Sequence, residues 1–436
     1  MKRIVFCALT ALAVVIAFTS ATVLNSTANA AVPRYAGGAP AQVRASGALP
    51  SGIVIVPALE KPANARKLEE KDFAGYLLVY FKDQTQSAYF AISRDGYTFT
   101  DVNGGQPVFD GALLAEQKGV RDPHITRGPD GAFYLAMTDL HIFGQRAGFR
   151  TTQWERPVEQ YGWGNNRALV LMKSWDLIHW THSNIRVDKA FPELGDLSAS
   201  WAPQTIYDEQ AGKMMVYFTI RYGPKECKLY YSYADDAFTR LATKPEVITG
   251  ISGIDGDIIK VGDKYHLHFV SDAKVLHAVS SRINGGYEAE SRRIDPETVS
   301  TEAPNVFKRL GTNTYVLMYD VYGARPNNMG FSETTDFVTY RNIGRFNEGV
   351  MKTTNFTGPK HGAVTYLTMD ELKSIAAHWS RCQTGLAGCA AVRESSARAA
   401  DAPDRRSIAC GRLPHPAPAL DAQPSPARLP AVFPNG

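Results

Sequence analysis

Four acidic residues stand near the start of short apolar segments that recur along this chain. They are Asp122, Asp255, Asp257 and Glu302, and the polar residues Gln204 and His361 occupy comparable positions. Two carboxyl groups can hydrolyse a glycosidic bond when one is protonated and donates to the leaving oxygen while the other is ionised and activates water. The acids are far apart in the sequence, so this chemistry requires a fold that brings the starts of these segments together.

The stretch from Arg121 to Asp139 shows the recurring plan. An acid next to a proline is followed by a short β-branched run, a Gly-Pro-Asp-Gly turn and an aromatic-rich segment, a composition that predicts a β-hairpin. The plan returns at Trp201, at Ile254 and at Glu302. A spacing of about 50 to 80 residues between copies is typical of solenoids, propellers and other repeat arrays.

The strand pattern predicts five units, each a three- or four-stranded antiparallel meander. They span residues 74–102, 122–181, 201–241, 255–291 and 302–342. After the fifth unit, residues 361–367 form one further strand, and this strand supplies the opening strand that the first unit lacks. Giving the last strand to the first blade closes a ring without a free edge. We therefore predict an all-β chain in which residues 53–379 form a five-bladed β-propeller, with a short helix at 368–379.

The two ends of the chain differ from the body. Residues 1–30 combine a basic head, an apolar run and small residues at Ala28-Asn29-Ala30, the pattern of a secretory signal peptide. An uncleaved membrane anchor is the alternative, because the run approaches the length of a span. Residues 31–52 are predicted to be a flexible lead-in, and residues 380–436, rich in Ala, Pro and Arg, a disordered tail. We expect export to the periplasm or the medium, without stable membrane insertion.

Charge and cysteine content limit the partners. The formal net charge is +4, but the predicted signal and the Arg-rich tail carry the excess, so residues 31–379 are close to neutral. A near-neutral body without a basic stripe excludes a nucleic-acid partner, and we expect a monomer. The spacing of the cysteines forces no disulfide and indicates no metal site: Cys7 lies in the signal, and the others are Cys227, Cys382, Cys389 and Cys410.

In a propeller the first strand of each blade lines the central channel, so we expect the six polar residues at the strand starts to face one cavity. Five short motifs occur along the chain: Arg121-Asp122-Pro123, Trp201-Ala202-Pro203, Ile254-Asp255, Glu302-Ala303-Pro304 and Ser174-x-Asp176-Leu177-x-x-Trp180. With these motifs in order, the sequence resembles glycoside hydrolase family 43, the five-bladed arabinosidases, xylosidases and galactosidases, over roughly residues 53–379. The resemblance implies inverting hydrolysis, with Asp122 as general base, Glu302 as general acid and no required cofactor.

One position departs from the family pattern. After Trp-Ala-Pro the family usually has an Asp that raises the pKa of the acid and orients it, and this chain has Gln204. An amide can orient a carboxyl group by hydrogen bonding but brings no charge. We therefore expect Asp255 or Asp257 to supply that effect and place Asp255 in the catalytic set; if neither does, activity would be weak or absent.

The resemblance also implies the class of substrate. A terminal α-L-arabinofuranose, β-D-galactofuranose or β-D-xylose of a plant or microbial oligo- or polysaccharide is the expectation. Trp163 lies with Trp154 in a long insertion, residues 140–166, where either ring could stack on a sugar face or simply pack in the loop. The residues expected to contact the sugar are Arg121, Trp201, Gln204, Asp257 and Trp163.

Each polar residue also has a structural interpretation. Asp122 could cap a turn, and Glu302 could be a solvated charge at a strand end. Asp255 and Asp257 alternate, so they should share one face of a strand and could hydrogen-bond within the blades. His361 either hydrogen-bonds a strand or coordinates Ca²⁺ or another ion in the channel, as a His does in several members of the family.

Two other functional classes stay open. Arg-Asp-Pro also resembles the signature of the invertase and fructanase propellers, but their Asn-Asp-Pro-Asn motif does not occur between residues 50 and 110. A non-catalytic sugar-binding propeller is the second alternative, and Gln204 is the main argument for it. Loss of activity on replacing Glu302 would separate a hydrolase from a lectin.

Overall fold

The structure is a computed structural model. It describes residues 52–144, 147–149, 156–223, 227–324, 327–353 and 355–383, and the backbone of residues 42–43 and 47–48. The predicted signal peptide and most of the predicted tail, with Trp154, Cys389 and Cys410, lie outside these residues. Within the described part, no helix is both long and apolar enough to cross a membrane.

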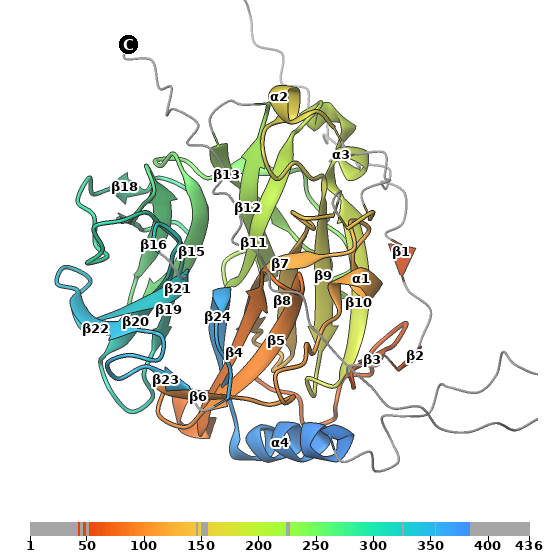
Figure 1. Cartoon of the computed structure of the whole chain (residues 1–436), viewed down its shortest axis with the longest axis vertical. Coiled ribbons are helices and arrows are strands. Elements are labelled where there is room, and N and C mark those ends of the chain that lie inside the picture. Colours follow the sequence, from red (N-terminus) through yellow and green to blue (C-terminus); the bar gives the residue numbers. More distant parts are fainter. Residues whose placement is uncertain are drawn as a thin grey trace, which may run out of the picture. The chain divides into compact units, whose positions relative to one another are not determined.

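Five sheets are arranged around a common centre as the blades of a β-propeller (Figure 1), which confirms the predicted fold class. Blades 3, 4 and 5 are regular four-stranded meanders in chain order. Blade 3 contains β11 (Ala199–Asp208), β12 (Lys213–Arg221), β13 (Cys227–Tyr233) and β14 (Glu246–Val247). Blade 4 contains β15 (Ile254–Val261), β16 (Lys264–Ser271), β17 (Lys274–Ser280) and β18 (Glu288–Ala289). Blade 5 contains β19 (Thr301–Lys308), β20 (Tyr315–Val321), β21 (Asn328–Thr334) and β22 (Arg341–Arg345).

Blades 1 and 2 contain additional strands from distant parts of the chain. In blade 2, the outer strand β10 also pairs with β1 and β3, and β2 pairs with β3. The predicted flexible lead-in therefore contains two two-residue strands, β1 and β2. Blade 2 contains β7 (Val120–Arg127), β8 (Phe133–Asp139), β9 (Ala168–Ser174), β10 (His179–Arg186), β1 (Gln42–Val43), β2 (Gly47–Ala48) and β3 (Val54–Ile55). Blade 1 contains β4 (Gly75–Lys82), β5 (Ser87–Ser93), β6 (Thr98–Asp101), β23 (Lys352–Thr353) and β24 (Lys360–Leu367).

The ring is closed by β24, which pairs antiparallel with β4 as the innermost strand of blade 1. This confirms the predicted closure by a C-terminal strand. Closure removes the exposed edge that β4 would otherwise present. It also brings residues from the end of the chain to the centre of the molecule, beside the innermost strands of the other blades.

All five innermost strands carry a β-bulge at the same point. In each, the pairing register shifts across the bulge, and the residue after the last regular pair has a positive φ. A bulge bends its strand and re-aims the side chains next to it, so each blade turns its residues toward the channel in the same way. The positive-φ residues are Asp122 (50°), Ala202 (45°), Asp255 (52°), Ala303 (59°) and His361 (26°).

The residue after each of these positions explains the proline motifs of the sequence. Three strands have proline there, and proline lacks the N–H that a bulge would leave unpaired. The other two have Gly256 and Gly362. A Cβ atom at Gly256 would lie 2.3 Å from Leu229 Cδ1, and one at Gly362 would lie 2.2 Å from the carbonyl oxygen of Val79.

Helices cover little of the chain. The predicted C-terminal helix is α4 (Met369–Gln383). The long insertion contains one helical turn, α2 (Val158–Tyr161). The remaining short helices are η1 (Glu70–Asp72), α1 (Gly111–Leu114), α2 (Val158–Tyr161), α3 (Val187–Ala190) and η2 (Pro192–Leu194).

Helix α4 packs its apolar face on the core shared by blades 1 and 2. Trp379 is fully buried there, with its ring centroid 5.8 Å from that of Phe90, and Trp180 belongs to the same cluster. The structure therefore places Trp180 in blade packing. The helix closes the end of this core and ties the last segment of the described chain to the first two blades.

Replacing Trp379 with alanine is expected to lower the free energy of unfolding by about 3–5 kcal/mol, the cost of deleting a buried aromatic side chain. Denaturation in urea measures this change. Lys373→Ala, an exposed position on the same helix, is the control and should change stability by no more than about 0.5 kcal/mol. Equal effects of the two substitutions would mean that the helix does not contribute to the core.

Candidate active site

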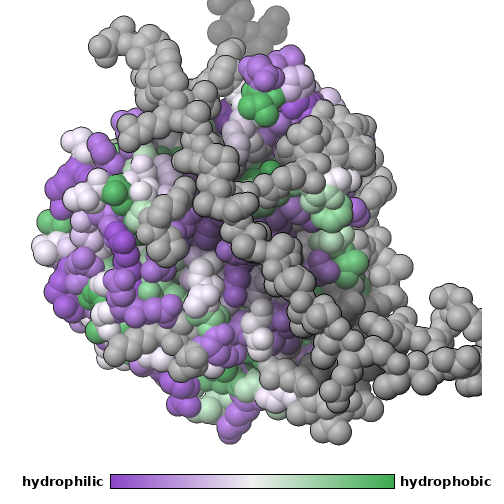
Figure 2. All heavy atoms as spheres, in the orientation of Figure 1, coloured by the Kyte–Doolittle hydropathy of each residue, from purple (hydrophilic) through white to green (hydrophobic). Residues whose placement is uncertain are grey.

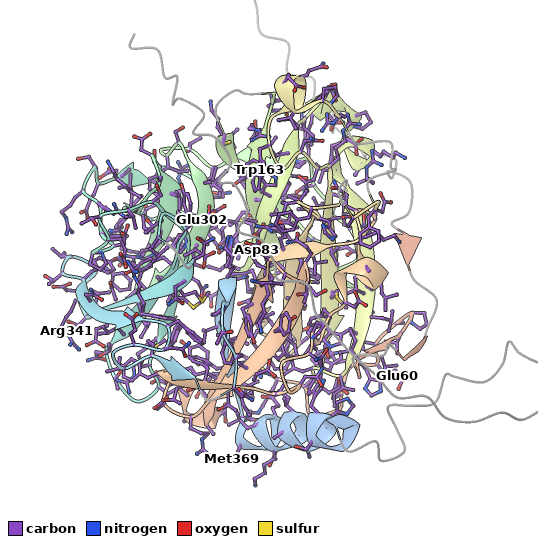
Figure 3. All side chains as sticks on the ribbon, in the orientation of Figure 1. Glu60, Asp83, Trp163, Glu302, Arg341 and Met369 are labelled. Atoms are coloured by element: carbon purple, nitrogen blue, oxygen red, sulfur yellow. The ribbon has the colours of Figure 1, made fainter. Side chains whose placement is uncertain are left out.

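The bulges divide the channel-lining side chains into two groups. The first group lies at or just before the bulge and is called the bulge ring: Arg121, Asp122, Asp255, Glu302, Lys360 and His361. The second group lies just after the bulge and is called the second ring: His124, Gln204, Asp257 and Asn305. Figure 3 shows Glu302 and Asp83 close to the centre, where the innermost strands converge.

Asp122, from β7, is held as a carboxylate. Its Oδ1 atom lies 3.2 Å from His361 Nδ1 on β24, and its Oδ2 accepts a hydrogen bond of 2.8 Å from the Thr138 hydroxyl. Burial alone would raise the pKa of Asp122, but the charge and hydrogen bond of His361, with further help from Arg121 and Thr138, lower it to about 2. The carboxylate is therefore ionised at any pH near neutrality.

His361 is the cationic partner of Asp122. Burial lowers its pKa, but the neighbouring Asp122, then Asp255 and Asp320, raise it to about 9. A protonated imidazole does not ligate a metal. Among the described residues, no group of three or more His, Cys, Asp or Glu side chains is arranged to hold a metal ion. The ion expected at His361 stays a prediction with no part in the mechanism below.

Asp255, from β15, differs from Asp122 in its charge state. One of its oxygens accepts a hydrogen bond of 3.3 Å from the Ala303 N–H of the neighbouring blade. Burial raises its pKa, His361 opposes this, and the charges of Glu302 and Asp122 raise it further, to about 7. Two carboxyl groups of the bulge ring thus have pKa values on opposite sides of the ordinary range.

Glu302, from β19, is the most accessible of these carboxyl groups. Its side chain is 31 % exposed, compared with 14 % for Asp122. The Lys360 ammonium lies 3.6 Å from its Oε1 atom. Glu302 can therefore meet a ligand that enters the channel, whereas Asp255 is buried.

Three charged residues of this region were not found by the sequence reasoning. Lys360 precedes His361 and occupies the same place before the bulge as Glu302 does in its strand. Asp320 is the cross-strand partner of Glu302 on β20. Asp83 follows β4. Only Lys360 had a usable signal, since it stands directly before the predicted channel residue.

Arg121, predicted to bind substrate, is engaged with the protein in this structure. Its Nη1 atom lies 2.7 Å from Asp83 Oδ1, and its guanidinium stacks 4.4 Å from the centre of the Phe81 ring. Asp83 also faces Lys360, with 3.6 Å between Oδ2 and Nζ. Asp83 thereby connects two cations of the bulge ring.

Gln204 and Asp257 lie in the second ring, separate from the carboxyl groups described above. Gln204 Oε1 accepts a hydrogen bond of 3.2 Å from the Tyr217 hydroxyl. Asp257 accepts hydrogen bonds from Asn305 Nδ2 (3.1 Å) and the Val306 N–H (2.6 Å). Beyond this ring the channel opens into a cavity of about 370 Å³ that Asp257 and Asn305 line.

One expectation from the sequence therefore needs correction. Asp255 and Asp257 do not share a face, because the bulge between Ile254 and Asp257 interrupts the alternation. Asp255, one of the two residues expected to supply the charge that Gln204 lacks, lies close enough to Glu302 to interact with it electrostatically. Gln204 therefore no longer argues for a propeller without catalytic activity.

Trp201 anchors the insertion that carries Trp163. Its indole N–H donates to the Gly164 carbonyl at 2.8 Å, and the Arg221 guanidinium lies 4.3 Å from the centre of its ring. Arg221 also donates to the carbonyl oxygens of Tyr161 and Trp163, each at 2.8 Å. Trp201, predicted to bind substrate, therefore supports the loop.

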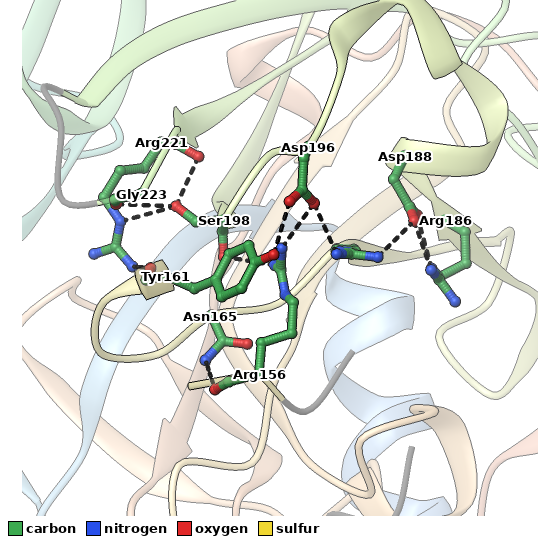
Figure 4. A network of polar contacts seen from close by, with 10 residues as sticks. Arg156, Tyr161, Asn165, Arg186, Asp188, Asp196, Ser198, Arg221 and Gly223 are labelled. Atoms are coloured by element: carbon green, nitrogen blue, oxygen red, sulfur yellow. Dashed lines mark hydrogen bonds and ion pairs between the residues drawn. The ribbon is translucent and has the colours of Figure 1, made fainter. Parts of the chain in front are cut away.

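A second set of contacts holds the same segment through Asp196 (Figure 4). The Asp196 carboxylate accepts hydrogen bonds from Arg156 (3.1 Å), Arg167 (2.8 Å) and the Tyr161 hydroxyl (2.8 Å). The backbone around Trp163 is thus fixed, while the Trp163 side chain is 57 % exposed.

Exposed apolar side chains are concentrated in this insertion. The visible face of the described chain is largely hydrophilic, with scattered apolar residues (Figure 2). Of the large hydrophobic residues that are exposed in the described chain, most belong to residues 140–166: Phe143, Phe149, Val158 and Trp163, against Val338 and Val350 elsewhere. A rigidly held, exposed indole is suited to stacking on a sugar ring.

Carboxyl groups of different charge state at the centre of a propeller can perform the acid–base chemistry of glycoside hydrolysis. Residues 71–373 match the family model Glyco_hydro_43_rel, described as a probable glycosyl hydrolase domain. The match covers more than half of the chain, so the chain belongs to this family and is a glycoside hydrolase of the family 43 type. The family assignment also removes the invertase and fructanase alternative.

Solved structures with a similar fold share little sequence with this chain. The Cellvibrio cellulosa α-L-arabinanase complexed with arabinohexaose is 13 % identical with a TM-score of 0.41, over 62 % of this chain and 91 % of that one. The GH43_1 enzyme from Xanthomonas citri complexed with xylose is 15 % identical with a TM-score of 0.38, over 52 % and 73 % of the two chains. At these values the likenesses carry no argument about activity. A search of the curated proteins finds no match.

The Asp122–His361 pair makes stability depend on pH. Because the pKa of His361 is raised from 6.5 to about 9, the pair stabilises the fold fully below about pH 6.5, and this contribution is lost as the pH rises through about 9. Because the pKa of Asp122 is lowered to about 2, its contribution is present above about pH 4 and is lost as the pH falls through 2. We expect the free energy of unfolding to fall by on the order of 1–3 kcal/mol between pH 6.5 and 9.

Urea denaturation across this pH range, on wild type and His361→Gln, measures the effect. The neutral amide should remove most of the pH dependence. His179→Gln removes a half-exposed histidine that pairs with Asp176 on the surface and is the matched control. An unchanged slope in His361→Gln would show that His361 is not the cation that stabilises Asp122.

Proposed function

We propose that this protein is an exported, inverting glycosidase that releases a terminal sugar from a plant or microbial oligo- or polysaccharide. The sugar is of the α-L-arabinofuranose, β-D-galactofuranose or β-D-xylose type. One observation carries the proposal: Asp122 is ionised, while Asp255, with a pKa of about 7, is buried beside the accessible Glu302. An ionised base and an acid in a different electrostatic environment are what inversion requires.

In the proposed mechanism Asp122 is the general base and Glu302 the general acid. The Asp122 carboxylate accepts a proton from a water molecule as the water oxygen attacks the anomeric carbon. On the opposite face of the ring, Glu302 transfers its proton to the glycosidic oxygen as the carbon–oxygen bond breaks. The sugar leaves with inverted anomeric configuration, Asp122 is protonated and Glu302 ionised, and exchange with solvent restores both.

In this mechanism, neighbouring residues set the orientation and charge state of the Asp122 and Glu302 carboxyl groups. His361 and the Thr138 hydroxyl orient the Asp122 carboxylate and keep it ionised. The buried Asp255 places like charge near Glu302, and like charge opposes ionisation of the acid. Trp163 is proposed to stack on the substrate at the channel entrance.

Glu302→Gln and Asp122→Asn are each expected to lower kcat by about 10²- to 10⁴-fold, the contribution of a general acid or base. Release of 4-nitrophenol from aryl α-L-arabinofuranoside, β-D-xyloside and β-D-galactofuranoside measures this loss. Glu193→Gln, an exposed surface substitution, is the control. Proton NMR of the first product should show the inverted anomer, and retention would contradict the assignment of Asp122 as base.

Trp163→Ala is expected to raise KM for oligosaccharides by about 3- to 10-fold, the loss of one aromatic stacking contact, while kcat and thermal stability stay close to wild type. Trp163→Phe should keep most of the affinity. Val158→Ala, another exposed apolar position of the insertion, should leave KM unchanged. An equal KM in Trp163→Ala and wild type would exclude a stacking contact.

A further inference from the structure

Lys360 forms ion pairs with three carboxyl groups at once in the described structure. Its ammonium nitrogen lies 3.6 Å from Glu302 Oε1, 3.6 Å from Asp83 Oδ2 and 3.8 Å from Asp320 Oδ2. These distances exceed those of a direct hydrogen bond. The ammonium is therefore shared between the carboxyl groups and is not committed to any one of them.

Asp320 is the least exposed of the three. It stands opposite Glu302 across β19 and β20, and it is 2 % exposed. Its Oδ1 accepts a hydrogen bond of 2.9 Å from the His361 N–H. Its Oδ2 is buried and has no hydrogen-bond partner among the described residues. A buried carboxyl oxygen without a hydrogen bond is costly and calls for an explanation.

Lys360 creates a conflict for the proposed acid. A cation close to a carboxyl group favours its ionised form, yet a general acid must hold its proton until the glycosidic bond breaks. Asp255 lies near Glu302 on the neighbouring blade, where Glu302 raises its pKa, but Asp255 has no ion pair with Lys360 among the described contacts. A second acid that competes for the same ammonium would resolve the conflict.

We propose that Asp320 is a positioning residue of the reaction, which draws the charge of Lys360 away from Glu302 and so keeps the acid protonated. The inference rests on the proposed role of Glu302. Burial raises the pKa of Asp320, Lys360 opposes this and Glu302 raises it further, to about 7. The groups that face Glu302 from the packed elements are Asp255 on β15, Asp320 on β20, Lys360 on β24, and Tyr322 after β20.

A purely structural role for Asp320 is the competing explanation. The His361 N–H belongs to the bulge, and Asp320 satisfies it. Asparagine at 320 keeps an oxygen for that N–H but removes the charge, whereas alanine removes both. Asp320→Asn therefore isolates the electrostatic effect, and Asp320→Ala reports the structural one.

The test compares Asp320→Asn, Lys360→Met and the double variant by pH profiles of kcat and KM. Asp320→Asn should lower kcat at neutral pH by about 10-fold and move the alkaline limb of the profile about one pH unit lower, with KM changed less than about 3-fold. Lys360→Met in the same chain should restore kcat and the position of the limb, because the cation that Asp320 offsets is then gone. A wild-type profile in Asp320→Asn, or a double variant no better than Asp320→Asn, would overturn the proposal.

A second measurement does not depend on turnover. In protein labelled with ¹³C at the Glu carboxyl groups, the Glu302 signal is assigned by its loss in Glu302→Gln, and Asp320→Asn should move its titration to lower pH. If wild type cleaves no glycoside but this shift is found, the proposed function fails and the link between Asp320 and Glu302 stands. If Glu302→Gln abolishes activity and Asp320→Asn shifts neither titration nor profile, only the inference about Asp320 fails.

Discussion

The β-bulge shared by the five innermost strands is the constraint on which the site depends. Each bulge holds a non-glycine residue at positive φ, a conformation that costs roughly 1–3 kcal/mol per residue and persists only where the surrounding structure supports it. Its effect is to re-aim the side chains beside it, so that residues from different blades meet at one level of the channel. Without the bulge, Asp255 would continue the alternation of its strand, and the separation between the bulge ring and the second ring would be lost.

Bringing these side chains together creates a dense set of buried charges, and the structure balances them in pairs. Asp122 is matched by His361 at 3.2 Å, and Asp83 by Arg121 at 2.7 Å. Lys360 is shared between Glu302, Asp320 and Asp83. Buried charges are stable only with such partners. The balance is uneven, because Asp122 is strongly stabilised as an anion while Asp255 and Asp320 are not, and this difference is what acid–base catalysis uses.

Ring closure contributes chemistry as well as stability. Strand β24 brings Lys360 and His361 into a ring otherwise formed by residues 121–302, and these two supply cations next to the predicted base and the predicted acid. The same closure continues into α4, whose Trp379 packs on the core of blades 1 and 2. The charges beside the predicted base and acid and the closure of the fold therefore depend on the same C-terminal segment. The insertion around Trp163 is held separately, by Trp201 and Arg221 of blade 3.

The sequence by itself determined the local features: the hairpins, the number of blades, the closing strand and the acids at the strand starts. Turn residues and strand periodicity are properties of neighbouring residues, so they can be recognised without a structure. It did not predict that Asp255 and Asp257 separate, because period-two alternation fails where a bulge inserts a residue. It also missed Asp320 and Asp83, and it placed Gln204 beside the acid. Those outcomes depend on cross-strand pairing and on contacts between blades, which join residues distant in the chain, and only the tertiary structure decides them.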